Sequence, residues 1–214
     1  MKFTSRVQLL SLELALLLPV TATAQPMQAT PVVLRVSLFD DAGVGATTLR
    51  EAARETSRIF LRANIDVIWL QCPQDSLAQT AFGRCSEASF PAHLHLRIAL
   101  RSHGANKYVV GMSFLSAEGK GCYADLFYEP VLELQRENHI GAAIILGHAM
   151  AHELGHLLLG TNSHSRYGLM RAQWNRNDLA QAARANLSFS PEESTRMRSR
   201  FTQDDPRTET AQIE

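Results

Sequence analysis

The sequence predicts an α+β fold: a mixed, twisted sheet of four or five strands, one long apolar helix after the sheet, and a small helical C-terminal lobe. Three observations lead to this prediction. Short runs rich in β-branched and apolar residues, bounded by turn residues, occur up to residue 128. Residues 131–159 then turn helical in period, and beyond Gly160 an irregular stretch leads to further helical segments.

The composition is that of an ordinary globular protein and favours no charged partner. The 214 residues include 21 Lys plus Arg and 21 Asp plus Glu, so the formal charge is zero. This balance provides no broad basic field for nucleic acid or anionic lipid, and neither partner is expected. A chain of this length buries roughly 70% of its unfolded surface, so its core does not depend on disulfides.

Residues 1–24 predict a secretory signal peptide. Lys2 and Arg6 supply a positive start, residues 9–18 form an apolar run, and residues 22–24 give a small-residue cleavage site. A membrane span needs about 20 apolar residues, twice the length of this run. The protein is therefore expected to be secreted or periplasmic, with no stable membrane insertion after the signal is cleaved.

The mature chain shows no linker long enough to divide it. Residues 25–201 are expected to form a single domain, whose C-terminal lobe covers about residues 160–201. Residues 202–214 are expected to form a flexible tail.

Export changes how the three cysteines are interpreted, because an oxidising compartment favours disulfides. Cys72 and Cys85 bracket a polar loop and are predicted to be linked, which stabilises the fold by about 3 kcal/mol in the chain-entropy model. Cys122 is left over and suits a buried thiol, although its pairing with either of the others stays open. With no CxxC pair in the chain, a cysteine zinc site has little support.

The first three elements alternate between strand and helix. Residues 32–39 predict a strand that ends at a turn signal, and Thr47 or Thr48 is expected to cap a helix that ends near Asn64. Residues 65–70 predict the second strand.

The third strand is predicted at residues 93–100, where apolar and polar residues alternate. His93 and His95 lie on the polar face of this strand. A solvated face is expected for them rather than a metal site.

Residues 109–115 and 122–128 predict two short strands that form a hairpin-like pair at the edge of the sheet. Residues 131–159 predict two helices, broken around residues 138–141. Two further helices are expected at residues 175–185 and 191–201, the latter begun by Ser190 with Pro191 in the first position.

The chemistry of the chain is concentrated at residues 152–156, His-Glu-Leu-Gly-His. Residues four apart share one face of a helix, so His152 and His156 can bind one Zn²⁺ while Glu153 reaches a metal-bound water and takes its proton. Zinc in such a site lowers the pKa of the water and polarises a scissile carbonyl. This arrangement is typical of a hydrolytic site.

The surroundings of this motif favour the metal. The helix is rich in Ala and Leu and is expected to be buried, where histidines and a carboxylate without a metal would be costly. Gly160 can end the helix in a left-handed conformation, and His164 then follows as a candidate third ligand.

These residues resemble the metzincin clan of zinc metallopeptidases, in which HExxHxxGxxH is followed by a turn with a methionine beneath the metal. The matching residues are His152, Glu153, His156, Gly160, His164 and Met170. Gly160 comes one place later than in the clan, His164 comes two places later, and Asn162 occupies the third-ligand spacing. His164 is favoured over Asn162 or no third protein ligand, because imidazole is a preferred zinc donor and a longer loop can deliver it.

The resemblance also implies an order of elements: strand, helix, strand, strand, edge strand, strand and active-site helix, which residues 31–159 follow. It implies that an extended substrate pairs with the edge strand, here residues 109–115. No propeptide fits between Gln25 and the first strand, so a cysteine-switch zymogen is not expected.

Several other side chains have structural interpretations. His148 is expected to be a helix-packed, hydrogen-bonded imidazole rather than a ligand. Packing is likewise expected for Tyr123 and Tyr167, although a tyrosine hydroxyl can also stabilise an oxyanion. The remaining aromatic and sulfur side chains considered, Trp69, Trp174, Met112 and Met150, are expected in core or lobe contacts.

The sequence thus predicts a secreted zinc-dependent metalloendopeptidase, with Glu153 as general base and His152, His156 and His164 as zinc ligands, that acts on a peptide or protein. The alternative is a non-catalytic zinc-binding protein or a degenerate peptidase fold that serves as a binding module. Metal-assisted hydrolysis of another substrate is a third possibility. An intact Glu153 argues against a purely structural zinc site.

Overall fold

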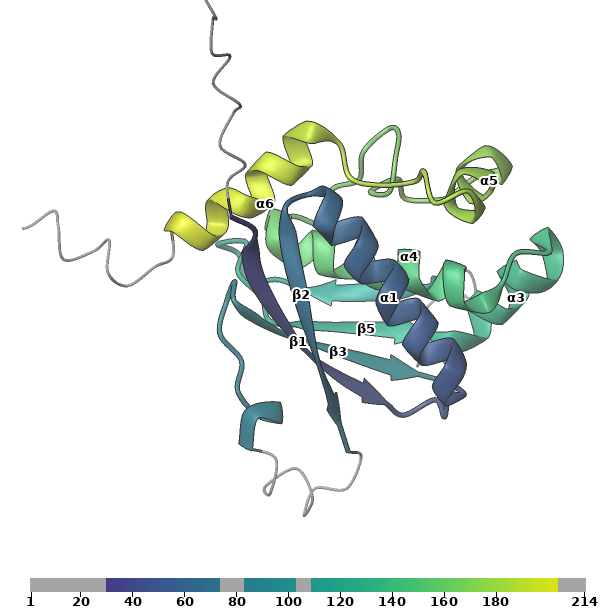
Figure 1. The fold of residues 1–214 in the computed structure, drawn as a ribbon, viewed down its shortest axis with the longest axis horizontal. Coiled ribbons are helices and arrows are strands. Elements are labelled where there is room, and N and C mark those ends of the chain that lie inside the picture. Colours follow the sequence, from purple (N-terminus) through teal and green to yellow (C-terminus); the bar gives the residue numbers. More distant parts are fainter. Residues whose placement is uncertain (1–29, 74–82, 103–108, 204–214) are drawn as a thin grey trace, which may run out of the picture.

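The computed structural model describes residues 30–73, 83–102 and 109–203. The predicted signal peptide, residues 1–24, lies outside the described residues, and so does most of the predicted tail. The described part of the chain forms a five-stranded sheet with long helices against one face (Figure 1).

The first unit of the fold is a parallel strand pair joined by a helix. β1 (Val32–Asp40) and β2 (Ile65–Cys72) pair in parallel, and α1 (Ala46–Arg62) connects them. The predicted threonine cap is wrong, because Gly45 is the residue before α1 and no side chain caps it. The first turn already contains both threonines.

The sheet has the order β2-β1-β3-β5-β4. β3 (His93–Ala99) is parallel to both β1 and β5 (Tyr123–Phe127), whereas β4 (Gly111–Phe114) is antiparallel to β5. The predicted hairpin pair at the sheet edge is therefore confirmed, and the sheet is mixed. Short strands of this kind are aligned by their neighbours more than by their own sequence.

The polar face of β3 is covered, which contradicts the expectation of a solvated face. His93 and His95 are only 4% and 9% exposed. His93 Nε2 lies 2.9 Å from Ser37 Oγ, and His95 Nε2 donates to the carbonyl of Glu87 at 2.6 Å. The alternation of the strand was interpreted correctly, but the segment before it folds back over this face.

The disulfide that holds this segment is confirmed. Cys72 and Cys85 are linked, with their Cα atoms 5.8 Å apart, and Cys85 ends the short 3₁₀ helix η1 (Gly83–Cys85). Cys122 is a free thiol and is half-buried. Burial raises the pKa of this thiol.

Two helices follow the sheet, as predicted. α3 (Tyr128–Asn138) begins three residues earlier than expected, and His139 in the left-handed conformation separates it from α4 (Ala142–Leu159). Within the described residues, α4 alone is long and apolar enough to cross a membrane. It is the central core helix, since 83% of it is buried inside the fold.

The C-terminal lobe contains two further helices. α5 (Arg176–Ala183) begins with a capping box between Asn175 and Asp178, and α6 (Pro191–Gln203) follows Ser190. Ser190 Oγ accepts from the Glu193 backbone, so the predicted start of this helix is confirmed. The helix extends two residues into the predicted tail.

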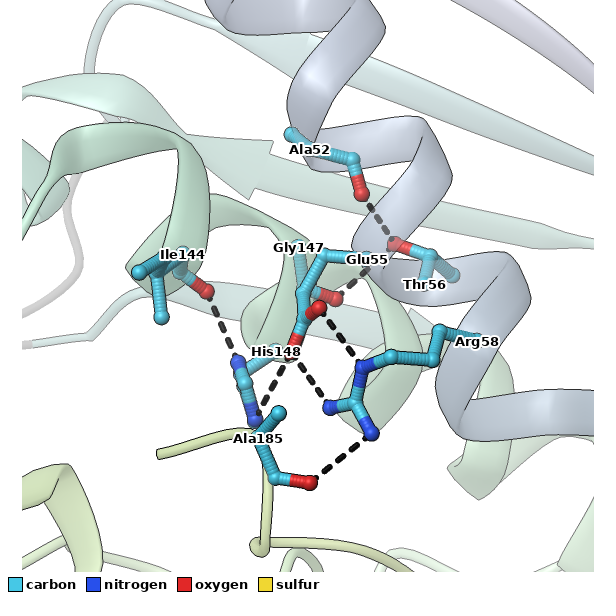
Figure 2. A network of polar contacts seen from close by, with 8 residues as sticks. All are labelled: Ala52, Glu55, Thr56, Arg58, Ile144, Gly147, His148 and Ala185. Carbon is cyan, nitrogen blue, oxygen red and sulfur yellow. Dashed lines mark hydrogen bonds and ion pairs between the residues drawn. The ribbon is translucent and has the colours of Figure 1, made fainter. Parts of the chain in front are cut away.

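Close packing of α1 against α4 depends on a glycine. A Cβ at Gly147 would lie 2.8 Å from both the carbonyl oxygen of Ala52 and Cβ of Glu55. The Thr56 hydroxyl lies within 2.9 Å of the carbonyls of Ala52 and Gly147, so it joins the two helices (Figure 2).

A polar network extends this contact to the C-terminal lobe. Arg58 pairs with Glu55 at 2.6 Å and donates to the carbonyl of Ala185 at 2.8 Å (Figure 2). His148 of α4 donates from Nδ1 to the Ile144 carbonyl, and its Nε2 lies 3.6 Å from Glu55. His148 is therefore a packed, hydrogen-bonded imidazole, as predicted.

Packing was predicted wrongly for three of the other side chains. Tyr167 is 80% exposed, Tyr123 52% and Met112 42%. Their positions in turns and on the outer side of the β4–β5 pair leave them uncovered. Met150 is fully buried, as expected, and Trp69 is partly buried against the core and donates to Ser57 Oγ.

Candidate metal centre

α4 brings His152 and His156 together on one face. Their Nε2 atoms are 3.0 Å apart and their rings are nearly perpendicular. The Nδ1 atom of His152 donates to the carbonyl of Leu169, and that of His156 donates to the carbonyl of Thr161, each at 2.8 Å. Both hydrogens are thereby assigned to Nδ1, which leaves two Nε2 lone pairs facing each other.

Two facing lone pairs repel each other unless a cation lies between them. Burial lowers the pKa of both imidazoles, that of His152 to about 4, so protonation does not provide this cation near neutral pH. A metal ion satisfies both nitrogens, and neutral imidazole is a preferred donor for zinc. The backbone carbonyls hold His152 and His156 in the tautomer whose Nε2 atom can bind a zinc ion.

His164 completes the group from the loop after α4. One ring nitrogen from each of His152, His156 and His164 lies within 4.8 Å of the others, and no second group of this kind occurs in the described part of the chain. The His164 ring lies over that of His152 at 5.4 Å and meets the edge of His156 at 4.8 Å. Asn162, the alternative third ligand, is exposed.

The loop is positioned by the end of the helix. Gly160 has φ of 66°, a left-handed conformation that glycine adopts without strain, and its N–H donates to the His156 carbonyl. The chain then turns so that the Thr161 carbonyl faces His156. Local sequence thus determines both the end of the helix and the hydrogen bond to a histidine.

Glu153 faces the same space and is held by the edge strand. Its side chain is buried, and Ser113 of β4 donates to Oε2 at 2.7 Å, or alternatively to the Glu153 carbonyl at 2.8 Å. Burial raises the pKa of the Glu153 carboxyl to about 7, and the hydrogen bond from Ser113 opposes this rise. A carboxyl with this pKa can both accept and return a proton near neutral pH.

Gly111 lets the strand approach this carboxylate. A Cβ at Gly111 would lie 2.6 Å from Cγ of Glu153 and 2.7 Å from Oε1. Neither Gly111 nor Ser113 was predicted from the sequence to be part of the site. Their spacing of two placed them on one face of the predicted edge strand, but nothing in the sequence indicated that this face meets α4.

A turn beneath the helix supports His152. The Leu169 carbonyl accepts from His152 and also from Nε1 of Trp174 at 3.0 Å. Met170 is buried, and its sulfur would lie 2.8 Å from a Cβ at Gly155. Met170 therefore packs closely against α4.

A cavity of about 640 Å³ opens beside this centre. His152, Glu153 and His164 line it together with residues of β4, α3 and the segment before α5. Neither of the tyrosines considered as oxyanion donors lines this cavity: Tyr167 is exposed, and Tyr123 contacts His95 on the other face of the sheet.

No protein-family model matches the sequence, and no curated protein matches it. The structure is similar to archaemetzincin from Methanopyrus kandleri, with a TM-score of 0.51 and 14% identity over 83% of this chain and 99% of that one. A zinc-dependent peptidase from Methanocorpusculum labreanum aligns with a TM-score of 0.49 and 14% identity, over 76% and 99% of the two chains. The first similarity confirms the predicted α+β, metzincin-like fold.

Proposed function

We propose that this chain is an exported zinc-dependent metallopeptidase. The observation that carries the proposal is the pair of Nε2 atoms 3.0 Å apart on His152 and His156, with both Nδ1 atoms donating to backbone carbonyls. His164 and the buried Glu153 face the same cavity. A metal-binding group with an adjacent base is the arrangement that hydrolysis requires.

His152, His156 and His164 would hold the zinc ion, at three imidazole nitrogens. Bound zinc would supply a Lewis acid and lower the pKa of a water in the site. Glu153 would accept the proton of the attacking water at its carboxylate and return it to the leaving amine. Ser113 would orient that carboxylate by its hydrogen bond to Oε2.

The edge strand supports a peptide as substrate. β4 pairs with β5 on one side, and its other side has no strand neighbour among the described residues. An extended peptide would add to this edge through backbone hydrogen bonds, as the metzincin resemblance implies. The cavity beside Glu153 would then receive a side chain of the peptide.

Export rests on residues 1–24, supported by the Cys72–Cys85 disulfide, since such links persist in oxidising compartments. The alternative function is a non-catalytic zinc-binding protein with a peptidase fold. The burial of Glu153 next to the ligands favours catalysis, because a structural zinc site has no use for a buried base. Hydrolysis of a non-peptide substrate would use the same residues, so an activity assay is needed to distinguish it from peptide hydrolysis.

The test combines metal analysis with a mixed peptide library. Purified mature protein is expected to contain about one zinc and to cleave peptides, and a chelator should abolish cleavage. Glu153→Gln should keep its zinc but lose about 10² to 10⁴ in rate, because the amide accepts no proton. Glu51→Gln, an exposed carboxylate on α1, is the matched control and should behave as the wild type.

Two outcomes would contradict the proposal. Undiminished cleavage by Glu153→Gln would remove the carboxylate from the mechanism. Stoichiometric zinc with no cleavage of any peptide by the wild type would favour the binding protein.

A further inference from the structure

We infer that the cavity beside the three histidines selects substrates with an arginine or lysine next to the scissile bond. The inference rests on the proposed function and names its substrate class. It follows from three features of the cavity: the wall formed by α3, the aromatic ring in its lining, and the distribution of charge.

One wall of the cavity is a single face of α3. Pro130, Glu133, Leu134 and Glu137 all line it, and their spacing of three and four residues places them in one row. Pro130 is buried and Leu134 packs against the core. Glu137 is exposed, and the side chain of Glu133 is 37% exposed. The wall is therefore apolar in its depth and acidic at its rim.

Trp174 and Val110 also line the cavity. The Trp174 indole meets the His152 ring edge-on at 5.9 Å, so it lies next to the proposed metal ligands. Lysine and arginine have long apolar stems that cover such surfaces while their charged ends stay near water. An indole face also attracts a guanidinium or ammonium group.

No cationic side chain among the described residues that line the cavity pairs with the acidic rim of α3. Arg171 lines the cavity but pairs with the buried Asp178, with Nη1 and Oδ2 at 3.3 Å. Glu133 reaches Arg136 only at 4.0 Å, between exposed side chains, and no ion pair of Glu137 occurs in the described part of the chain. At the rim, Glu137 and the loosely paired Glu133 can therefore attract a cationic end of a substrate side chain.

The test measures binding, so that it does not depend on catalysis. The zinc-loaded Glu153→Gln protein is titrated into two fluorescein-labelled hexapeptide pools, one with arginine and one with citrulline at the third position and mixed residues elsewhere. Citrulline keeps the shape of arginine without its charge. The arginine pool is expected to bind about tenfold more tightly than the citrulline pool, because each of the two partly screened carboxylates raises the affinity for a cationic side chain a few-fold. The preference should shrink as salt is raised.

Matched variants assign the preference to the α3 wall. Glu133→Gln combined with Glu137→Gln should reduce the preference to less than about twofold. Glu129→Gln, on the same helix but outside the cavity lining, should leave the tenfold preference intact. Equal binding of the two pools, or a preference that survives the double substitution, would overturn the inference.

Cleavage of the same pools by the wild type separates this inference from the proposed function. A preference in binding without cleavage of either pool supports the cavity and refutes the peptidase. Equal cleavage of the two pools, with no preference in binding, supports the peptidase and refutes the selectivity.

Discussion

The contact between Gly111 and Glu153 leads to a sharp prediction for Gly111→Ala. The added Cβ would lie 2.6 Å from Cγ of Glu153, whereas ordinary contact begins at 3.4 Å. Either the carboxylate or β4 must therefore move by roughly 0.8 Å, and a misplacement near 1 Å can lower an enzymatic rate about 10²-fold. The same overlap should reduce the free energy of unfolding by about 1 to 3 kcal/mol.

Peptide cleavage, zinc content and urea unfolding of Gly111→Ala would test this reasoning. We expect kcat/KM to fall about 10²-fold with zinc content unchanged, because the three atoms nearest to the new methyl group all belong to Glu153 and none to a proposed zinc ligand. Gly45→Ala is the control, since a Cβ at Gly45 meets nothing within 4 Å. A Gly111→Ala enzyme within twofold of the wild type would refute the claim that β4 positions the carboxylate.

Three further predictions concern the ligand set, the disulfide and pH. His164→Ala should lower zinc affinity strongly and Asn162→Ala should not, and the reverse ranking by zinc titration would make Asn162 the ligand. Non-reducing peptide mapping should find Cys72 linked to Cys85 and the third cysteine free, and any other linkage would contradict this. Burial lowers the pKa of His93 in the folded protein below its ordinary value of 6.5. The unfolded chain therefore binds a proton at His93 at a higher pH than the folded protein does, and the free energy of unfolding falls as the pH drops below 6.5. Urea unfolding of His93→Gln should show a weaker loss between pH 7.5 and pH 5.5 than the wild type, and an equal loss would place the titration elsewhere.

Much of the candidate site could be predicted because its geometry is local. Two histidines four residues apart meet on any α-helix, and the adjacent Glu153 needs no tertiary information to lie beside them. The left-handed end at Gly160 follows from glycine's freedom at positive φ. His164 was predicted as a ligand from its place in the loop after the helix, from the metzincin resemblance and from the preference of zinc for imidazole, and the structure brings it within reach of the other two.

The contacts of the edge strand could not be predicted from local sequence. The sequence predicts a strand around residues 109–115, but it does not predict that Ser113 donates to a carboxylate 40 residues away. The same limit applies to β3. Alternation separates its two faces correctly, but it does not predict that Ser37 of β1 and the carbonyl of Glu87 cover His93 and His95. The first residues of α1 and α3 differ by a few positions from the predicted ones, because several nearby positions are suitable for a helix start.

The order of the elements, the histidine pair beside Glu153 and the loop disulfide could all be predicted from the sequence. Each of these depends on spacing within a few turns of chain, where backbone geometry permits few arrangements. The tertiary structure decided which strand face meets α4, how the carboxylate is held and which side chains line the cavity. These depend on packing between residues far apart in sequence, where apolar patterning specifies that a face is buried but not which neighbour covers it.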